Sequence, residues 1–320
     1  MNSPSRTTGR LSGRITRRTA LTTIALAATT ALALTACSGG GDPLSADKPA
    51  GTSGASSVIV GSADFPESQL LATIYAQALN AAGVTATTKL NIGSREVYMP
   101  ALLDGSINLL PEYAGATLSY LDKTVEATTP EEVAAGLKKA LPKGISMLTP
   151  SDAQDSDTLA VTKETAEKYN LKTVSDLIPV AGDIVLGGPP EWKTRHEGVA
   201  GLKEVYGLEF KEFKTLDVAG PLTLTALLNG QIQVADLTST DPAIAENDLV
   251  ALKDDKNLFP AQNIVPIVAT DQVNDKLTKV LDSVSAALTT KALIEMNGRL
   301  AKQDSIDAVA ADWLKANKIG

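Results

Sequence analysis

Carboxylates are the most frequent reactive side chains of this chain, and other kinds of chemistry have few residues to use. The 320 residues include 37 Asp and Glu but only one Cys and one His. This leaves little for a zinc site, for His-dependent catalysis or for an intramolecular disulfide. Two carboxylates in a cleft would suit a hydrolase, so a carboxylate-dependent hydrolase stays open as an alternative. The sequence contains no Gly-x-Ser-x-Gly motif and no metal-ligand cluster. We therefore expect no enzyme activity, no catalytic residues, no metal and no cofactor.

Polar residues follow two similar segments of the sequence. Residues 101–109 match residues 226–234 in register, and both read as a helix end, a glycine turn and a strand start. Two such α/β halves suggest two lobes with a cleft between them. Ligands of α/β sheets bind beyond the carboxyl ends of the strands. Here those ends lead into residues 111–113 and 236–241, where we expect a ligand to bind.

The elements that position these residues are predicted from periodicity. Val58 begins a short strand, and a helix runs from Pro66 to its end at Gly83. A strand over 84–90, a helix over 95–103 and a strand over 107–110 complete a β-α-β-α-β order, which predicts a parallel, doubly wound sheet. Further segments are expected as a strand over 158–161 and helices over 130–141, 163–169, 274–288, 291–300 and 305–317.

The first residues read as an export signal. Five Arg residues and no acidic residue precede an apolar run that starts near Ala20. The run has roughly 17 residues, which is marginal for a permanent membrane span. It ends in Leu34-Thr35-Ala36-Cys37, which resembles a bacterial lipobox. That resemblance implies cleavage after residues 1–36 and a diacylglycerol on Cys37, although a buried structural Cys is the simpler alternative. Residues 16–21 leave open whether export is by the Sec or the twin-arginine route.

The residues that follow read as a tether and an acidic body. Residues 37–57 begin with Cys37 and are rich in Gly, Ser, Ala and Pro, which is typical of a flexible linker. The chain carries a net charge of −8, and loss of the Arg-rich prefix would make it more negative. Phosphate backbones require a basic surface, so no nucleic-acid partner is expected.

Several motifs together resemble the substrate-binding proteins of osmoprotectant ABC importers, which take up glycine betaine, choline or carnitine. The resemblance starts at Gly61-Ser62 with Phe65-Pro66-Glu67 and continues at residues 105–109 and at Pro111-Glu112-Tyr113-Ala114-Gly115. Residues 206–208, 239–241, 254–256 and 259–260 follow in the family's order. The resemblance covers nearly all of residues 58–320. It implies an α/β, two-lobed periplasmic-binding-protein fold with a hinge and an interlobe cleft, and delivery of a small-molecule ligand to a membrane permease.

The resemblance also implies a set of ligand-binding residues. In this family a cage of Tyr rings holds a quaternary ammonium by cation–π contact. Tyr113 matches one ring, whereas the other three Tyr positions fall at Asp157, Thr238 and Gln262. A family Lys falls at Ala63, and a family Thr falls at Ala116. The resulting set of expected ligand-binding residues is Phe65, Glu67, Tyr113, Asp157, Trp192, Arg195, Thr238 and Gln262. This pocket is more polar than an ammonium cage, so we expect a small polar, hydroxylated or quaternary-ammonium-type solute rather than simply glycine betaine.

Each of these residues has a plainer structural interpretation. Tyr113 could be an ordinary half-buried strand residue, and Trp192 an ordinary core residue. Arg195 could lie on the surface beside Glu191 and Glu197, where exposed pairs contribute little. Asp157 could belong to a solvated acidic loop. Asp241 precedes Pro242 and could cap the next helix.

The expected organisation is two lobes joined by two chain crossings. Residues 58–150 with 242–320 would form the first lobe and residues 151–241 the second, with hinges near 150–152 and at Thr240 and Asp241. Closure of the lobes on the ligand would precede docking on the permease. We expect a monomer, exported and lipid-anchored through Cys37 on the outer face of the cytoplasmic membrane. A ligand-sensing lipoprotein without transport stays open as an alternative.

Overall fold

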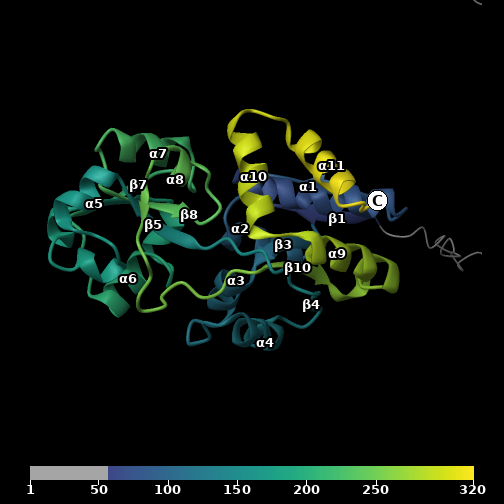
Figure 1. The fold of residues 1–320 in the computed structure, drawn as a ribbon. Coiled ribbons are helices and arrows are strands. Elements are labelled where there is room, and N and C mark those ends of the chain that lie inside the picture. Colours follow the sequence, from purple (N-terminus) through teal and green to yellow (C-terminus); the bar gives the residue numbers. More distant parts are fainter. Residues whose placement is uncertain (1–56) are drawn as a thin grey trace, which may run out of the picture. The chain divides into compact units, whose positions relative to one another are not determined.

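The computed structural model describes residues 57–320. The predicted signal, Cys37 and nearly all of the predicted tether lie outside these residues. The described chain forms two five-stranded sheets, each with helices packed against it (Figure 1). We call the first sheet with its helices the first lobe and the second sheet with its helices the second lobe.

The first sheet has the strand order β2-β1-β3-β10-β4. Strand β1 (Val58–Gly61) is parallel to β2 (Ala86–Lys89) and to β3 (Leu109–Tyr113). Strand β10 (Ile264–Ala269) is antiparallel to β3 and to β4 (Ile145–Met147). The expected parallel pairing therefore holds for three strands only. The sheet is mixed because β10 joins it only after the chain has returned from the second lobe. Local periodicity does not show a pairing between segments so far apart in the sequence.

Seven helices belong to the first lobe within the described residues. They are α1 (Pro66–Ala81), α2 (Arg95–Leu103), α3 (Ala114–Leu121), α4 (Pro130–Ala140), α9 (Asp275–Ala287), α10 (Thr290–Ala301) and α11 (Ile306–Ala316). Helix α1 begins at Pro66, whose fixed backbone suits a first helical position. Helix α4 begins with a capping box, in which Thr129 and Glu132 satisfy each other's backbone N–H groups. Local sequence signals therefore set where these two helices start.

The second sheet has the order β7-β6-β8-β5-β9. Strand β6 (Val185–Gly188) is parallel to β7 (Glu212–Thr215) and β8 (Val234–Thr238), and β5 (Asp157–Val161) is antiparallel to β8 and β9 (Val250–Ala251). The helices of this lobe are α5 (Lys163–Tyr169), α6 (Val199–Tyr206), α7 (Pro221–Leu228) and α8 (Ala243–Glu246). Single 3-10 turns lie at Val174–Leu177, Ala181–Asp183 and Pro190–Lys193, and a further one at Thr270–Gln272 follows β10.

The repeated sequence segment is also a repeated structure. Gly105 follows α2 with φ +80°, and Gly230 follows α7 with φ +69°, a left-handed conformation that favours glycine. The N–H of Ile107 donates to Ala101 at 3.1 Å, and that of Ile232 donates to Ala226 at 3.2 Å. Each turn then leads into the third strand of its sheet's parallel set. The two lobes therefore share the same helix-turn-strand unit.

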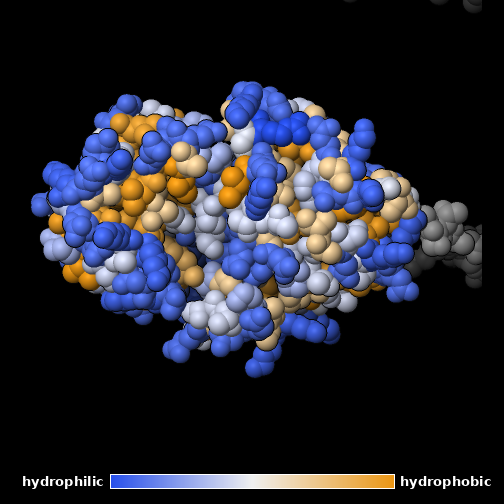
Figure 2. Space-filling view, viewed as in Figure 1, coloured by the Kyte–Doolittle hydropathy of each residue, from blue (hydrophilic) through white to orange (hydrophobic). Residues whose placement is uncertain are grey.

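Apolar side chains bury both faces of each sheet. In the first sheet, Val60 and Leu109 pack into one cluster, while Leu110 packs into a second. In the second sheet, Leu159 and Leu237 belong to different clusters. Figure 2 shows a largely hydrophilic outline with hydrophobic groups gathered where Figure 1 labels α7, whose Leu222 is 63% exposed.

Two neighbouring segments of the chain connect the lobes. Gln154 and Asn263 form an antiparallel bridge, and the N–H of Asp155 donates to the carbonyl of Gln262 at 3.2 Å. The expected return at 240–241 precedes β9, which still pairs with β5 in the second sheet. Leu258 also packs in the second lobe, whereas Ala261 packs in the first. The chain thus passes back to the first lobe near residues 260–263.

Candidate functional site

A buried carboxylate, that of Glu67, joins the two lobes. Glu67 is the second residue of α1 and is 5% exposed. Its Oε1 accepts a hydrogen bond from the Tyr113 hydroxyl at 2.9 Å, and its Oε2 accepts from Thr240 Oγ1 at 2.6 Å and from Asn297 Nδ2 at 2.6 Å. Tyr113 and Asn297 belong to the first lobe, whereas Thr240 follows β8 of the second. Three donors satisfy this buried group, and they fix one arrangement of the lobes.

Asp155 extends this network at the crossing between the lobes. Its Oδ1 accepts from the backbone N–H of Thr240 at 3.0 Å and from Ser239 Oγ at 3.3 Å. Burial and the nearby charge of Glu67 raise the pKa of Asp155 well above its ordinary value. Both residues predicted to act as hinges thus lie close to this crossing. Thr240 bonds across the lobes, whereas Asp241 accepts from the N–H of Ala243 at 2.8 Å at the start of α8.

Asp157 and Thr238 lie opposite each other at the ends of β5 and β8. Residues paired in this way share one face of the sheet. Asp157 has one side-chain partner, Trp192 Nε1, which lies 3.4 Å from Oδ2. Burial and the charge of Glu197 raise the pKa of Asp157 to about 6. A carboxylate with one long hydrogen bond retains the capacity to accept others.

Trp192 is a core residue of the second lobe. It is 1% exposed, and its ring stacks on Phe259 with centroids 6.5 Å apart and an interplanar angle of 14°. Its indole N–H reaches Asp157, but its ring faces protein. The structure thus supports the plainer of the two interpretations for the ring, and it gives the N–H a positioning role beside Asp157.

Asp236 was not singled out by itself from the sequence. It lies on β8 opposite Leu159, on the face that carries Asp157 and Thr238. It is 4% exposed, and its Oδ1 is buried without a hydrogen-bond partner. Burial and the charge of Asp157 raise the pKa of Asp236 well above its ordinary value. Buried polar atoms without a partner are uncommon in folded proteins and call for an explanation.

Arg195 forms an ion pair across the lobes. Its Nε and Nη2 donate to the two oxygens of Glu96 at 3.2 and 3.0 Å, and Glu191 lies 3.9 Å from Nη2. Partial burial alone would raise the pKa of Glu96, but hydrogen bonds from Arg195 and Ser94 outweigh it and lower this pKa to about 2. Arg195 therefore does more than lie on the surface beside its neighbours, because it connects the segment between the 3-10 turn Pro190–Lys193 and α6 to α2.

A second, fully buried ion pair supports the first lobe. Nε and Nη2 of Arg95 donate to the two oxygens of Glu112 at 3.1 and 2.9 Å. Burial opposes the charge of Arg95, but the charge of Glu112 offsets this and raises the pKa of Arg95. The sequence signal for this pair is the position of Glu112 in a predicted strand. A charged strand residue with buried neighbours needs an oppositely charged partner. Its partner in α2 could not be found from spacing.

The two remaining predicted residues make structural contacts. Gln262 is 2% exposed, and its Oε1 accepts from the N–H of Ala116 at 2.9 Å. Phe65 precedes α1, and its ring centroid lies 5.9 Å from that of Tyr113. The structure therefore brings together Glu67, Tyr113 and Thr240 in one network. Asp157 lies beside Trp192 and opposite Thr238, whose Oγ1 lies 3.4 Å from that of Thr240. Asn297, Asp155, Asp236, Arg95 and Glu96 were missed, because their roles depend on long-range contacts.

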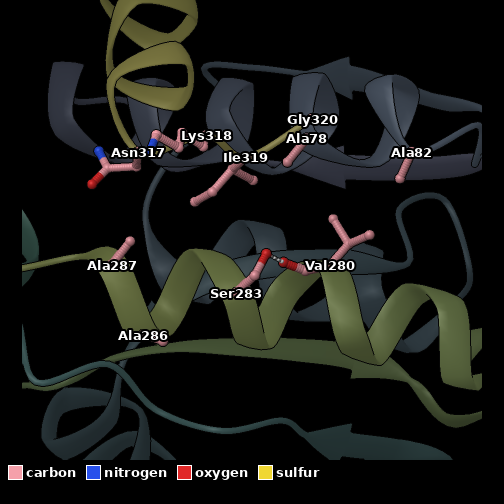
Figure 3. A pocket seen from close by; sticks show the side chains of 10 residues that line it. All are labelled: Ala78, Ala82, Val280, Ser283, Ala286, Ala287, Asn317, Lys318, Ile319 and Gly320. Carbon is pink, nitrogen blue, oxygen red and sulfur yellow. Dashed lines mark hydrogen bonds between the residues drawn. The ribbon is translucent and has the colours of Figure 1, made fainter.

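A cavity of about 390 Å³ opens between the lobes. Arg95, Glu96, Ser119 and Tyr120 line it from the first lobe, and Arg195 and Glu197 are among those lining it from the second. A groove of about 420 Å³ lies elsewhere, between α1, α9 and the four C-terminal residues (Figure 3). None of the predicted ligand-binding residues lines that groove, and its Ser283 hydroxyl donates within its own helix to Val280. The interlobe cavity is therefore the candidate ligand site.

No three His, Cys, Asp or Glu side chains within residues 57–320 are placed to hold a metal ion. In the same range, no helix has the length and apolar character required to cross a membrane.

Comparison with known proteins gives a consistent family. Residues 56–316 match the family described as the substrate binding domain of ABC-type glycine betaine transport system. A glycine-betaine-binding protein of Pseudomonas aeruginosa is 27% identical over 285 residues, covering 84% of this chain and 91% of that protein. The carnitine transport binding protein OpuCC of Listeria monocytogenes is 29% identical, covering 83% of this chain and 89% of that protein. A solved glycine betaine/carnitine/choline ABC transporter structure matches with a TM-score of 0.66 and 26% identity, covering 82% of this chain and 99% of the other. These relatives are substrate-binding transport proteins rather than enzymes, and the structural neighbour shows the two-lobed fold.

Proposed function

Because the chain belongs to the family of substrate-binding domains of ABC-type glycine betaine transport systems, we propose that it captures a small solute in the interlobe cavity and delivers it to a membrane permease. The observation that carries this proposal is the pair of contacts across the lobes. Thr240 donates to Glu67, and Arg195 bonds to Glu96 at the cavity wall. Contacts of this kind form when the lobes close and break when they open. A solute that binds both walls would stabilise the closed state by its higher affinity for it.

The proposed site combines one residue of the cavity lining with residues at two strand ends of the second lobe. Arg195 lines the cavity, and Asp157 and Thr238 lie at adjacent strand ends. Glu67, Tyr113 and Thr240 would act as a closing contact beside them. Gln262, Trp192 and Phe65 would hold this arrangement in place rather than contact the solute. We place the hinge at Asp155 and at residues 260–263, with residues 156–259 as the second lobe.

The proposed cellular setting is export and lipid anchoring. Residues 1–36 would be removed and Cys37 lipidated, and the tether would keep the body close to its permease at high effective concentration. The body would act as a monomer on the outer face of the cytoplasmic membrane. Figure 2 shows hydrophobic groups over α7, a kind of surface that suits contact with a protein partner.

The test combines recovery and uptake. The purified protein is equilibrated with a mixture of small organic solutes, and the retained solute is released and identified by mass spectrometry after a prolonged incubation. We expect it to be returned unchanged, and cells that lack the protein to lose its uptake. A chemically altered product would support the hydrolase alternative. Binding without any effect of the deletion on uptake would support the sensing alternative.

A further inference from the structure

We infer that an acidic wall in the second lobe, made of Asp157, Asp236 and Glu197, binds an organic cation that carries N–H donors, such as a primary ammonium, in preference to a quaternary ammonium. Of these three residues, Glu197 lines the interlobe cavity. The inference rests on the proposed function and names the chemical class of the solute. It depends on four features of the described residues: an unpaired acceptor, its acidic neighbours, the pairing of the arginines and the position of the aromatic rings.

The unpaired acceptor is Asp236 Oδ1. The side chain is 4% exposed, and this oxygen has no hydrogen-bond partner. Leaving a buried acceptor unpaired costs free energy, so such groups occur where a role compensates for the cost. A ligand N–H would supply the missing donor. A quaternary ammonium has none, and would leave the oxygen as it is.

The neighbours of Asp236 are acidic and form one wall. A Cβ added at Gly188 would lie 3.1 Å from Cβ of Asp236 and 3.4 Å from Cε3 of Trp192, so Asp236 lies beside the Trp192 ring. The indole N–H of Trp192 points to Asp157. The charge of Asp157 acts on Asp236, and that of Glu197 acts on Asp157. Glu197 is 4% exposed and lines the cavity, which connects this wall to the space where a solute would enter.

The two arginines that line the cavity are already paired. Arg95 is held by both oxygens of Glu112, and Arg195 by both oxygens of Glu96. Lys123 also lines the cavity, but it is exposed. A ligand carboxylate would have to displace Glu112 or Glu96 to bind an arginine. Asp157 and Asp236, in contrast, have no cationic partner, so the charge that this wall lacks is positive.

The aromatic rings of Trp192 and Tyr113 do not form a cage. One face of Trp192 stacks on Phe259, and the Tyr113 ring is 8% exposed with its hydroxyl bound to Glu67. A quaternary ammonium is held by several open ring faces, which these residues do not offer. Carboxylates bind an N–H cation more strongly, through charge-assisted hydrogen bonds.

Binding of a cation at this wall would release protons. Burial holds the pKa of Asp157 at about 6 and raises that of Asp236, and a bound cation would lower both. Affinity should therefore increase as the pH rises from 5 to 7. The charged groups that act on the two carboxylates are Asp155, Glu191, Arg195, Glu197 and Arg95.

The test is calorimetric titration with matched pairs of probes. Ethanolamine and choline differ only in N-methylation, as do butylamine and butyltrimethylammonium. At pH 7 we expect the primary amine of at least one pair to bind at least tenfold more tightly than its trimethylated partner. We expect Asp236→Asn to lower that affinity at least tenfold, and Asp152→Asn, at an exposed position, to leave it unchanged.

Stability separates a binding role of Asp236 from a structural one. Without ligand, Asp236→Asn should melt at the same temperature as the wild type or higher, because it removes a buried carboxyl group whose charged form is opposed by burial. A fall in melting temperature would mean that Asp236 serves the fold, and would overturn the inference. Equal or tighter binding of the trimethylated probes in both pairs would overturn it as well, and so would binding of neither probe by folded protein. Tight choline binding that Asp236→Asn does not change would overturn the inference and leave the proposed function standing. If cells that lack the protein took up the bound solute as well as normal cells do, the proposed function itself would be wrong.

Discussion

The hydroxyl of Thr240 donates to the carboxylate of Glu67 at 2.6 Å, and this bond joins the second lobe to the start of α1. Thr240 is fully buried, and its Oγ1 also lies 3.1 Å from Asn297 Nδ2. The two partners are 173 positions apart in the sequence. The bond can therefore form only when the two lobes are in contact.

We expect Thr240→Val to lower the free energy of unfolding by about 1–3 kcal/mol, because it leaves Glu67 with one donor fewer in a buried site. Valine has nearly the same shape as threonine, so packing is retained. Urea unfolding measures the loss. Thr240→Ser keeps the hydroxyl and should cost less. A negligible loss for Thr240→Val would show that the hydrogen bond to Glu67 does not stabilise the fold.

Glu112→Gln should be the most destabilising single change in the first lobe. It would leave the buried guanidinium of Arg95 without its charged partner, at a cost of about 3–5 kcal/mol. The same substitution at the exposed Glu126 is the control and should stay within about 0.5 kcal/mol of the wild type. The free energy of unfolding in urea decides between them. If Glu112→Gln lowered the free energy of unfolding less than Thr240→Val does, the ion pair between Arg95 and Glu112 would not be a main source of stability in the first lobe.

Asp157 should make the protein less stable as the pH rises from 4 to 6. Its pKa is about 6 in the folded state against an ordinary value of 3.8, so the folded state binds more protons in this interval and stability falls with rising pH. Above pH 6 the unfavourable contribution is complete. Asp157→Asn should therefore raise the free energy of unfolding at pH 7 by about 1–3 kcal/mol and have little effect at pH 4.

The control variant for the Asp157 prediction is Asp152→Asn, which removes a carboxylate at an exposed position. The difference in unfolding free energy between each variant and the wild type is measured at pH 4, 5, 6 and 7. A difference for Asp157→Asn that stays constant over this range would show that the carboxyl titrates normally.

Cys37→Ser should abolish lipid attachment. Only a thiolate at the position after the cleavage site can accept the diacylglycerol that the lipobox resemblance implies. We expect cells expressing the variant to incorporate no labelled fatty acid into the protein and to lose it from the membrane fraction. Ser38→Ala, one residue later, should keep both. Membrane retention of the Cys37→Ser protein at the wild-type level would contradict lipid anchoring.

The sequence predicted the parts of the fold that local signals determine. Helix α2 lies at Arg95–Leu103 and helix α5 at Lys163–Tyr169, as periodicity indicated, and Pro100 is accommodated inside α2. The repeated glycine turn also predicted two similar halves. The antiparallel pairing of β10 could not be predicted, because it depends on where the chain returns from the second lobe.

The site was predicted less completely for the same reason. Family motifs pointed to Glu67, Tyr113 and Asp157, which the structure places at contacts between or beside the lobes. Asn297 has no local signal, since it lies on a C-terminal helix and meets Glu67 only in the folded chain. Asp236 appeared in sequence as one of several polar residues, and only its burial without a partner distinguishes it.

The most direct test of the central claim is equilibrium dialysis of the folded protein against a defined mixture of small organic solutes at millimolar concentration, followed by mass spectrometry of what is retained. The account predicts about one molecule of a single solute class per protein, lost when Asp157→Arg places a cation beside Trp192 in the second lobe. Retention of no solute by folded wild-type protein, or retention that Asp157→Arg does not change, would contradict it.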